Sequence, residues 1–251
     1  IPLNPNPNPN PNPNDVNEPT LIDGTGDIQI GEEYQPNFPK PGKIKDIACG
    51  DNHSLILNED GTVFSFGNNA SGKCGYDPNQ NPNPNPNPWR PFQIPDNNRF
   101  ENKNITSIAC GYNHNLLLRQ GDVFTFGDNS ENQLGRILQL LMNDDPNPNL
   151  LNLTGVKKIA CGANHSMIIT QNGSVHGFGD DTYGKTGVNR NINLIRQSVY
   201  QANGVAGFED NRWNLVAQNP DKPLLIKGTG TDGPNNIYGE IVDVACGLNH
   251  T

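Results

Sequence analysis

The chain has 251 residues, with 27 Gly, 22 Pro and a formal net charge of -9 at pH 7. No apolar run approaches the roughly 20 residues that span a bilayer, which excludes a membrane protein. The 17 Lys and Arg residues are scattered rather than clustered, so we expect no direct binding to nucleic acid. The first 14 residues contain neither a basic nor an apolar stretch, so no secretory signal is expected. We interpret the chain as an intracellular protein and as a fragment or a processed product.

Asn and Pro are concentrated in three low-complexity tracts. The first is the segment 1–14, and the others occupy positions 78–88 and 144–149. Pro removes backbone donors and favours polyproline II, while Asn tolerates turns, so we expect semi-stiff, solvated loops without a core. These loops are interpreted either as drift in low-complexity sequence or as a presented binding surface.

A repeated phrase follows the first tract and determines the architecture. In every copy, Ala-Cys-Gly has aliphatic residues two and five positions before the Cys and a His four positions after it. The four copies are IKDIACGDNHSLIL from Ile44, ITSIACGYNHNLLL from Ile105, VKKIACGANHSMII from Val156 and IVDVACGLNHT from Ile241. The first three are followed by EDGTVFSFGNN, RQGDVFTFGDN and QNGSVHGFGDD, and then by a phrase that ends in Gly75, Gly135 or Gly187.

Each copy predicts about four strands. In the first, an apolar run from His53 to Leu57 ends at Glu-Asp-Gly and is followed by the run from Thr62 to Phe66, which predicts a β-hairpin. The turn of the second copy is one residue shorter. The aliphatic pair before Ala-Cys-Gly supplies another strand, and a fourth apolar phrase precedes each copy, at positions 19–22, 91–94, 150–153 and 223–226. A repeated four-stranded sheet must stack on its neighbours, and radial stacking gives a β-propeller.

These phrases together resemble the repeat of the regulator of chromosome condensation 1 (RCC1) family, although Phe66, Phe126 and Phe178 stand where that family usually carries a Trp. The resemblance implies an all-β fold, an RCC1-like β-propeller of seven four-stranded blades, of which this chain supplies about three and a half. The partial propeller is expected over residues 15–251, with repeat cores near 44–75, 105–135, 156–187 and 241–251. We expect the remaining blades to lie outside this sequence, because an open half-propeller exposes sheet faces and edges.

One Cys-x-x-x-His pair in each copy supplies the candidate structural residues. We expect each Cys to pack as a small hydrophobe and each His to cap or bridge backbone groups at the start of its strand. Metal binding is not expected, since no further Cys or His stands near each pair in sequence. The five cysteines suggest a reducing compartment rather than a disulfide framework. The repeat residues singled out are Cys49, His53, Gly67, Cys110, His114, Gly127, Cys161, His165, Gly179, Cys246 and His250.

The connection after the third copy is a longer insertion, 188–221. Apolar residues at positions 192, 195, 199 and 202 follow helical spacing, so a short amphipathic helix is expected, and 136–142 is a second candidate helical turn. Such an insertion either contacts a partner, because loops on a rigid scaffold commonly carry function, or merely covers the propeller rim. The candidate partner-binding residues are Ile192, Ile195, Val199 and Trp213.

No cofactor or catalytic residue is expected. The stretch from Gly228 to Gly233 matches a dinucleotide-binding fingerprint, but Pro234 and two Asn residues follow it where a helix would be needed. No nucleophile elbow, zinc-protease helix or kinase signature occurs in the sequence.

The resemblance favours three functions, and fold alone does not choose among them. The first is a non-catalytic scaffold for protein–protein interaction, as part of a larger protein or assembly. The second is guanine nucleotide exchange on a Ran-like small GTPase, which needs no covalent chemistry. The third is the substrate- or partner-binding propeller of a larger enzyme such as a ubiquitin ligase. In each case the expected partner is a protein, either a small GTPase or a large assembly.

Overall fold

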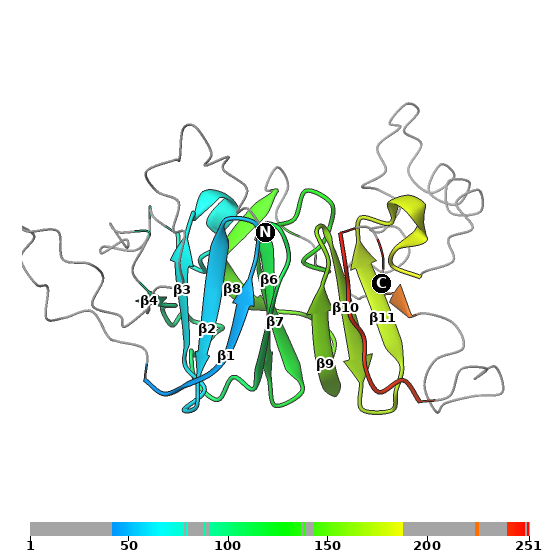
Figure 1. Ribbon diagram of the computed structural model, residues 1–251, viewed down its shortest axis with the longest axis horizontal. Coiled ribbons are helices and arrows are strands. Elements are labelled where there is room, and N and C mark those ends of the chain that lie inside the picture. Colours follow the sequence, from blue (N-terminus) through cyan, green and yellow to red (C-terminus); the bar gives the residue numbers. More distant parts are fainter. Residues whose placement is uncertain are drawn as a thin grey trace, which may run out of the picture.

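The computed structural model describes residues 42–77, 79, 88, 91–136, 138, 143–187, 224–225, 240–248 and 250. Within them the chain forms three four-stranded antiparallel sheets, which stand side by side (Figure 1). Each sheet is one blade, so the expected all-β fold with four-stranded blades is confirmed. The segments 1–14, 19–22 and 188–221, for which expectations were stated, lie outside the described residues.

The three blades share one strand order. Blade 1 comprises β1 (Ile44–Cys49), β2 (His53–Asn58), β3 (Val63–Gly67) and β4 (Phe92–Gln93). Blade 2 comprises β5 (Ser107–Cys110), β6 (His114–Arg119), β7 (Asp122–Asp128) and β8 (Asp144–Leu150). Blade 3 comprises β9 (Val156–Cys161), β10 (His165–Thr170), β11 (Val175–Gly179) and β12 (Leu224–Leu225). Short 3-10 helices follow the third strand in blades 1 and 3, namely η1 (Ala70–Gly72) and η2 (Thr182–Gly184).

The second and third strands of each blade form the expected hairpin. In blade 2 the turn is reduced to Gln120 and Gly121, whose φ angles are 51° and 91°. Two successive left-handed residues are the requirement of a type I′ turn, whose twist matches that of the flanking strands. In blade 1 the turn is longer and contains Gly61 with φ 83°. The shorter turn expected for the second copy is therefore confirmed.

The hydrophobic core lies between the blades rather than within one sheet. Leu117 on β6 packs into the cluster shared with blade 1, whereas Leu116 and Leu118 face the cluster shared with blade 3. A strand that is buried on both faces requires apolar side chains at successive positions, which explains the Leu-Leu-Leu run. Each fully buried Leu contributes roughly 1.5–3 kcal/mol of transfer free energy.

The aliphatic pair of each first strand closes the core against the preceding blade. The packed pairs are Ile105 and Ile108 against blade 1, Val156 and Ile159 against blade 2, and Ile241 and Val244 against blade 3. The equivalent residues of β1, Ile44 and Ile47, are 47% and 63% exposed. They are exposed because no blade precedes β1 within the described part of the chain.

The structure corrects the expected fourth strand of blade 2. β8 ends at Leu150 rather than beginning there, and it contains the third Asn-Pro tract, 144–149, which we expected to be a solvated loop. β8 lies at the edge of its sheet, beside β7. Pro has no N–H to donate, and an edge strand tolerates this because one side of its backbone is unpaired. The tract is therefore part of the blade.

The remaining fourth-strand expectations are met over shorter lengths. β4 and β12 are two-residue strands inside the expected 91–94 and 223–226. The aliphatic segment of the fourth copy, 241–246, packs on blade 3 but is not a strand, contrary to expectation. No described strand pairs with it, so it does not belong to a sheet. Of the candidate helical turn 136–142, only positions 136 and 138 are described, and neither is helical.

Candidate functional site

One end of the three blades gathers most of the repeat residues that the sequence singled out. We name this end the upper face. It is formed by the loops 50–52, 111–113 and 162–164, the turns 68–77, 128–136 and 180–187 and the start of β8, at the top of Figure 1. Each loop joins the first strand of a blade to the second, and each turn leaves the third strand. The face is therefore built from the same positions in every blade.

The glycine that ends each third strand brings this strand against the neighbouring loop. Gly67 has φ 106°, and a Cβ there would lie 2.5 Å from the carbonyl oxygen of Asn52 and 2.7 Å from the Cα of His53. Gly127 and Gly179 have φ 105° and 102° and equally close contacts. The backbone N–H of Asn68 then donates to the Asn52 carbonyl at 2.7 Å. Only Gly accepts both this conformation and this approach.

The repeat histidines link adjacent blades through side chains. The Nε2 atom of His53 lies 2.7 Å from Oδ1 of Asn115 on β6, and Nε2 of His114 lies 2.9 Å from Oγ of Ser166 on β10. Asn115 and Ser166 in turn donate to the backbone carbonyls of Lys73 and Gln133. His53 and His114 thus each contact the residue that follows the histidine of the next blade. For these two histidines, the expectation that the ring would cap or bridge backbone groups was wrong, because the polar side chain of the next blade stands between the ring and the backbone carbonyl.

These contacts fix the histidine tautomer. The Oδ1 atom of Asn115 can only accept, and the Ser166 hydroxyl already donates to a carbonyl, so Nε2 of both histidines carries the proton. The Nδ1 atoms of His53 and His114 are buried without a hydrogen-bond partner. Burial, with smaller contributions from the nearby His165 and His53, lowers the pKa of His114 to about 3. Burial also lowers the pKa of His53, against the hydrogen bond to Asn115. Both rings are neutral inter-blade links rather than catalytic bases.

The repeat cysteines lie on the first strands, where the blades meet. Cys110, Cys161 and Cys246 pack against the three inter-blade clusters, as small hydrophobes do. Burial raises the pKa of the Cys110 and Cys161 thiols well above the ordinary range, so neither is a reactive thiolate. Cys49 is exposed, because it lies on the uncovered face of β1.

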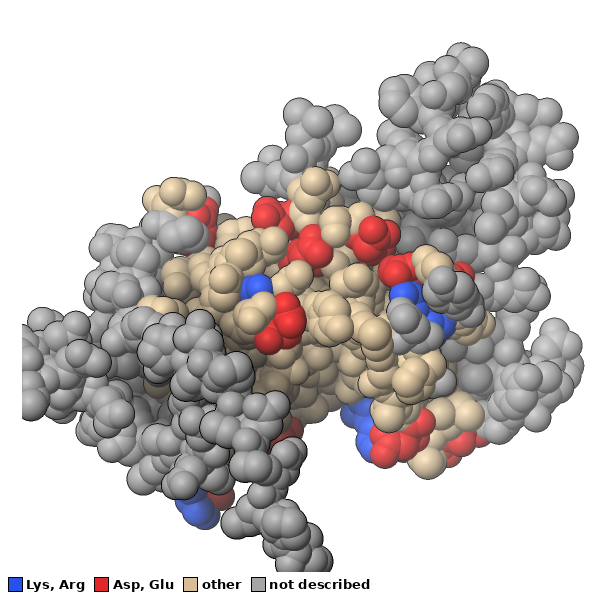
Figure 2. Space-filling model, turned by 45° about the horizontal axis from the view of Figure 1, so that its top comes forward, with Lys and Arg blue, Asp and Glu red and all other residues tan. Residues whose placement is uncertain are grey.

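The upper face presents negative charge to solvent, and Figure 2 shows acidic side chains spread over it. Its loops, turns and strand start contain the acidic residues Asp51, Asp77, Asp128, Glu131, Asp144, Asp145, Asp180 and Asp181. The same segments contain the basic residues Lys73, Arg136 and Lys185. Lys73 and Lys185 are only 4% and 6% exposed, and the Arg136 side chain only 12%. The cations therefore serve the interior of the face. Among the carboxylates, Asp51, Glu131 and Asp144 are exposed, and the others are partly buried.

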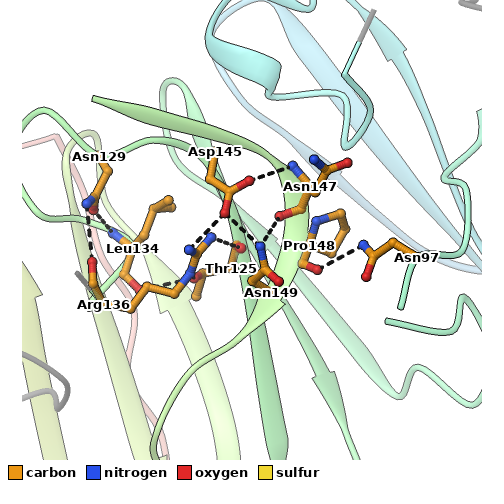
Figure 3. A network of polar contacts seen from close by, with 9 residues as sticks. All are labelled: Asn97, Thr125, Asn129, Leu134, Arg136, Asp145, Asn147, Pro148 and Asn149. Atoms are coloured by element: carbon orange, nitrogen blue, oxygen red, sulfur yellow. Dashed lines mark hydrogen bonds and ion pairs between the residues drawn. The ribbon is translucent and has the colours of Figure 1, made fainter. Parts of the chain in front are cut away.

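A polar network ties the third Asn-Pro tract to this face (Figure 3). Arg136 Nη1 lies 2.9 Å from Asp145 Oδ2, and the other guanidinium nitrogens donate to the hydroxyl and carbonyl of Thr125. Asp145 also accepts from the N–H of Asn147 and from Nδ2 of Asn149. Burial lowers the pKa of Arg136, and the Asp145 charge opposes this shift. The asparagines of the tract are thus structural ligands of a half-buried carboxylate.

This tract also holds blade 2 against blade 1. Asn97 lies in the segment that connects β4 of blade 1 to β5 of blade 2, and its Nδ2 donates to the Pro148 carbonyl at 3.2 Å. Gly72 in η1 approaches Pro146 so closely that a Cβ there would lie 2.2 Å from the Pro146 Cα. These contacts place the prolines at an inter-blade junction.

The other candidate residues fall partly outside this geometry. His250 is exposed, and Ile192, Ile195, Val199 and Trp213 lie outside the described residues. Over the described ranges, no group of three or more His, Cys, Asp and Glu side chains is placed to hold a metal ion. In the same part of the chain, no helix is long and apolar enough to cross a membrane.

Sequence reasoning missed the partners of the repeat histidines. Asn115 and Ser166 occupy the position immediately after the histidine, and Ser54 occupies it in blade 1. A polar residue at this place, inside an otherwise apolar strand, was the available signal. The sequence did not reveal its role, because the histidine that contacts it belongs to the preceding blade, 62 residues away for Asn115 and 52 for Ser166.

The described geometry defines a repeat module of the β-propeller class, in which equivalent loops of successive four-stranded blades build one face. The chain belongs to the RCC1 repeat family. Two forms of the regulator of chromosome condensation (RCC1) repeat match it, one at residues 44–73, 105–133 and 156–185 and the other at residues 60–118 and 120–169.

Several known proteins are similar to this chain. Human RCC2 is 31% identical over 205 residues, which cover 79% of this chain and 35% of RCC2. The human probable E3 ubiquitin-protein ligase HERC6 is 33% identical over 174 residues, covering 64% of this chain and 16% of that protein. The crystal structure of Prp20p from Saccharomyces cerevisiae matches with a TM-score of 0.54 and 25% identity, over 82% of this chain and 42% of Prp20p. The chain thus spans about a third of the length of RCC2.

Proposed function

We propose that the chain belongs to a non-catalytic β-propeller scaffold whose upper face binds a basic surface of a partner protein. The observation that carries this proposal is the excess of carboxylates on that face, of which Asp51, Glu131 and Asp144 are exposed, while its three cations are largely buried. Complementary charge steers association and selects partners. A face made of loops on stacked sheets is also a rigid platform for recognition.

The likeness to Prp20p supports a partner of this chemistry. That protein is described as binding Gsp1p and histones, and histones are strongly basic. The insertion 188–221 begins directly after the upper-face turn 180–187, so Ile192, Ile195, Val199 and Trp213 are proposed to add apolar contacts beside the charged ones. An intracellular location is part of this proposal.

The test compares charge reversal on the two ends of the blades. Glu131→Lys with Asp144→Lys changes two exposed carboxylates of the upper face, and Glu59→Lys with Glu101→Lys changes two at the opposite end. Binding of the full chain to purified core histones is measured by fluorescence anisotropy at 150 mM salt. We expect at least tenfold weaker binding for the upper-face variant and little change for the control. Equal effects of the two variants would refute the assignment of the face.

Guanine nucleotide exchange on a Ran-like GTPase is the second candidate, and the similarity to Prp20p, described as binding Gsp1p, favours it. Exchange requires no catalytic side chain, since it acts by distorting the nucleotide site of the GTPase. Catalytic amounts of the protein should accelerate release of labelled GDP from purified Ran. Unchanged release rates would remove this function and leave the scaffold proposal standing. The similarity to HERC6 keeps a third context, a propeller within a larger ligase, as a proposal for the whole protein.

A further inference from the structure

One position of the upper face differs between blades in a way that points to a ligand. It is two residues before Gly75, Gly135 and Gly187, and it is occupied by Lys73 in blade 1, Gln133 in blade 2 and Lys185 in blade 3. All three residues are buried, with at most 6% of their surface exposed. The backbone carbonyls of Lys73 and Gln133 receive the inter-blade hydrogen bonds from Asn115 and Ser166. The position is therefore fixed in space by the blade stack.

In blades 2 and 3 the side chain at this position meets an aspartate of its own blade. Gln133 Nε2 donates to Asp128 Oδ2 at 2.9 Å, and Lys185 Nζ lies 2.5 Å from Asp180 Oδ2. The other carboxylate oxygen of each aspartate accepts the N–H of the residue two positions later, at 2.9 Å and 2.8 Å. One carboxylate oxygen thus accepts a backbone N–H of the turn. The second oxygen accepts the hydrogen bond of Gln133 in blade 2 and pairs with the Lys185 ammonium in blade 3.

Blade 1 lacks this second oxygen. Asn68 stands at the place of the two aspartates, and its Oδ1 accepts the N–H of Ala70 at 2.7 Å, as the aspartates do for their turns. The remaining group of Asn68 is an NH₂, which donates and cannot accept from an ammonium. Lys73 instead reaches across to blade 2, where its Nζ donates to Oδ1 of Asn113 at 2.7 Å. Within the described residues, no carboxylate lies within ion-pair distance of Lys73.

A buried ammonium with a neutral partner is costly, because desolvation is offset by a hydrogen bond but not by an opposite charge. Its charge is felt locally, since it contributes to lowering the pKa of His53, after the larger effect of burial. Tyr112, beside Asn113, is 43% exposed and adds an aromatic surface of the kind that anchors protein interfaces. The loop that receives the Lys73 ammonium therefore also carries an exposed aromatic residue.

We propose that Lys73, Asn68 and Asn113 form a subsite for a single carboxylate, carried by an Asp or Glu side chain of the partner protein. The proposal rests on the proposed function of the upper face and names one group of its partner. The ammonium supplies the charge, and the free NH₂ of Asn68 supplies a second donor. Carboxylates of the same face, such as Asp51 and Asp77, would repel a polyanion, so one carboxylate on an otherwise basic surface fits better than nucleic acid or phosphate.

The experiment uses the full chain labelled with nitrogen-15 and the probe N-acetyl-glutamate N-methylamide, titrated at constant ionic strength. The glutamine analogue is the neutral control, and inorganic phosphate is a second arm. We expect a saturable shift of the Asn113 side-chain amide signal with the glutamate probe, at a half-saturation on the order of 10 mM, which is typical of one ion pair. The glutamine analogue should cause no such shift.

Two variants separate the subsite from its surroundings. Lys73→Met should abolish the saturable shift. Asn68→Asp restores the oxygen that blades 2 and 3 possess, so it should occupy Lys73 internally, weaken probe binding at least tenfold and raise the thermal midpoint. Asn68→Asp keeps the test valid even if Lys73→Met does not fold.

The outcomes are distinct. Absence of saturation in the native chain, or saturation unchanged by both variants, overturns the subsite. Tighter binding of phosphate than of the glutamate probe overturns the carboxylate assignment. The probe binds without a partner protein. If the probe does not bind but the upper face still binds histones, the subsite is refuted and the proposed function stands. A successful titration with failed charge reversal removes the proposed function alone.

Discussion

Replacing Asp145 with Ala should destabilise blade 2 by about 3 kcal/mol, because it leaves the Arg136 guanidinium buried without a carboxylate. The two side chains are 12% and 16% exposed and approach to 2.9 Å. Asp145 also accepts from Asn147 and Asn149, so the substitution leaves two further donors unsatisfied. Breaking one partner of a buried pair costs roughly 3–5 kcal/mol, and we take the lower end since some solvent reaches both groups.

The assay is urea unfolding followed by circular dichroism in the far ultraviolet. With a slope of about 2 kcal/mol per M, a loss of about 3 kcal/mol moves the midpoint by about 1.5 M. Glu101→Ala is the matched control, because the Glu101–Lys103 pair is 59% exposed on both sides and should be worth less than about 1 kcal/mol. The double variant Arg136→Met with Asp145→Leu should recover most of the loss, since apolar groups of similar size replace a buried pair at little cost.

The result that refutes this reasoning is an Asp145→Ala midpoint no lower than that of Glu101→Ala. The third Asn-Pro tract would then be held by its β8 backbone pairing and by its contacts with Asn97 and Gly72. A double variant as unstable as the single one would show instead that shape, rather than charge, is what the network supplies.

Three further predictions concern the blade stack. The pKa of His114 is about 3 when folded and about 6.5 when unfolded, so stability is full above pH 6.5 and falls as pH drops from 6.5 toward 3, by about 2 kcal/mol at pH 5. His114→Gln should flatten urea midpoints between pH 7.5 and pH 5, and an unchanged slope would contradict the link. Gly67→Ala should lower the thermal midpoint far more than Gly155→Ala, because a Cβ at Gly67 meets backbone at 2.5 Å and at Gly155 meets nothing within 4 Å. Ile108→Ala should cost about 2–5 kcal/mol by urea titration, against less than about 1 kcal/mol for Ile47→Ala at the same repeat position, and similar losses would mean that β1 is covered in solution.

Local patterns predicted most of the fold, because they depend on residues close together in sequence. The apolar run from Leu116 to Leu118 predicts a strand buried on both faces. The short turn contains Gly121, and both Gln120 and Gly121 adopt the left-handed conformation that a tight hairpin requires. For the third Asn-Pro tract, the same reliance on nearby residues gave a wrong prediction, namely a solvated loop instead of strand β8. Its composition favours a loop, and only the folded blade brings the Arg136 guanidinium against Asp145 in an edge strand.

The candidate site was less predictable than the fold. The sequence identified the repeat histidines and glycines, but not that His53 reaches Asn115 or that Lys73 reaches Asn113, each in the next blade. Such contacts depend on the angle and spacing between stacked sheets, which no single repeat contains. Likewise, counting charges gives -9 for the chain, while only burial tells which charges the solvent meets.

The sequence by itself therefore determined the repeat, its four-stranded unit and its family, because strand periodicity and turn glycines act within a few residues. The tertiary structure decided how repeats are joined, which cations are buried and which carboxylates remain exposed. It also showed that Asn68 in place of an aspartate leaves Lys73 without the ion pair that Lys185 has. Electrostatic pairing is set by distances across blades, and those distances exist only once the blades have stacked.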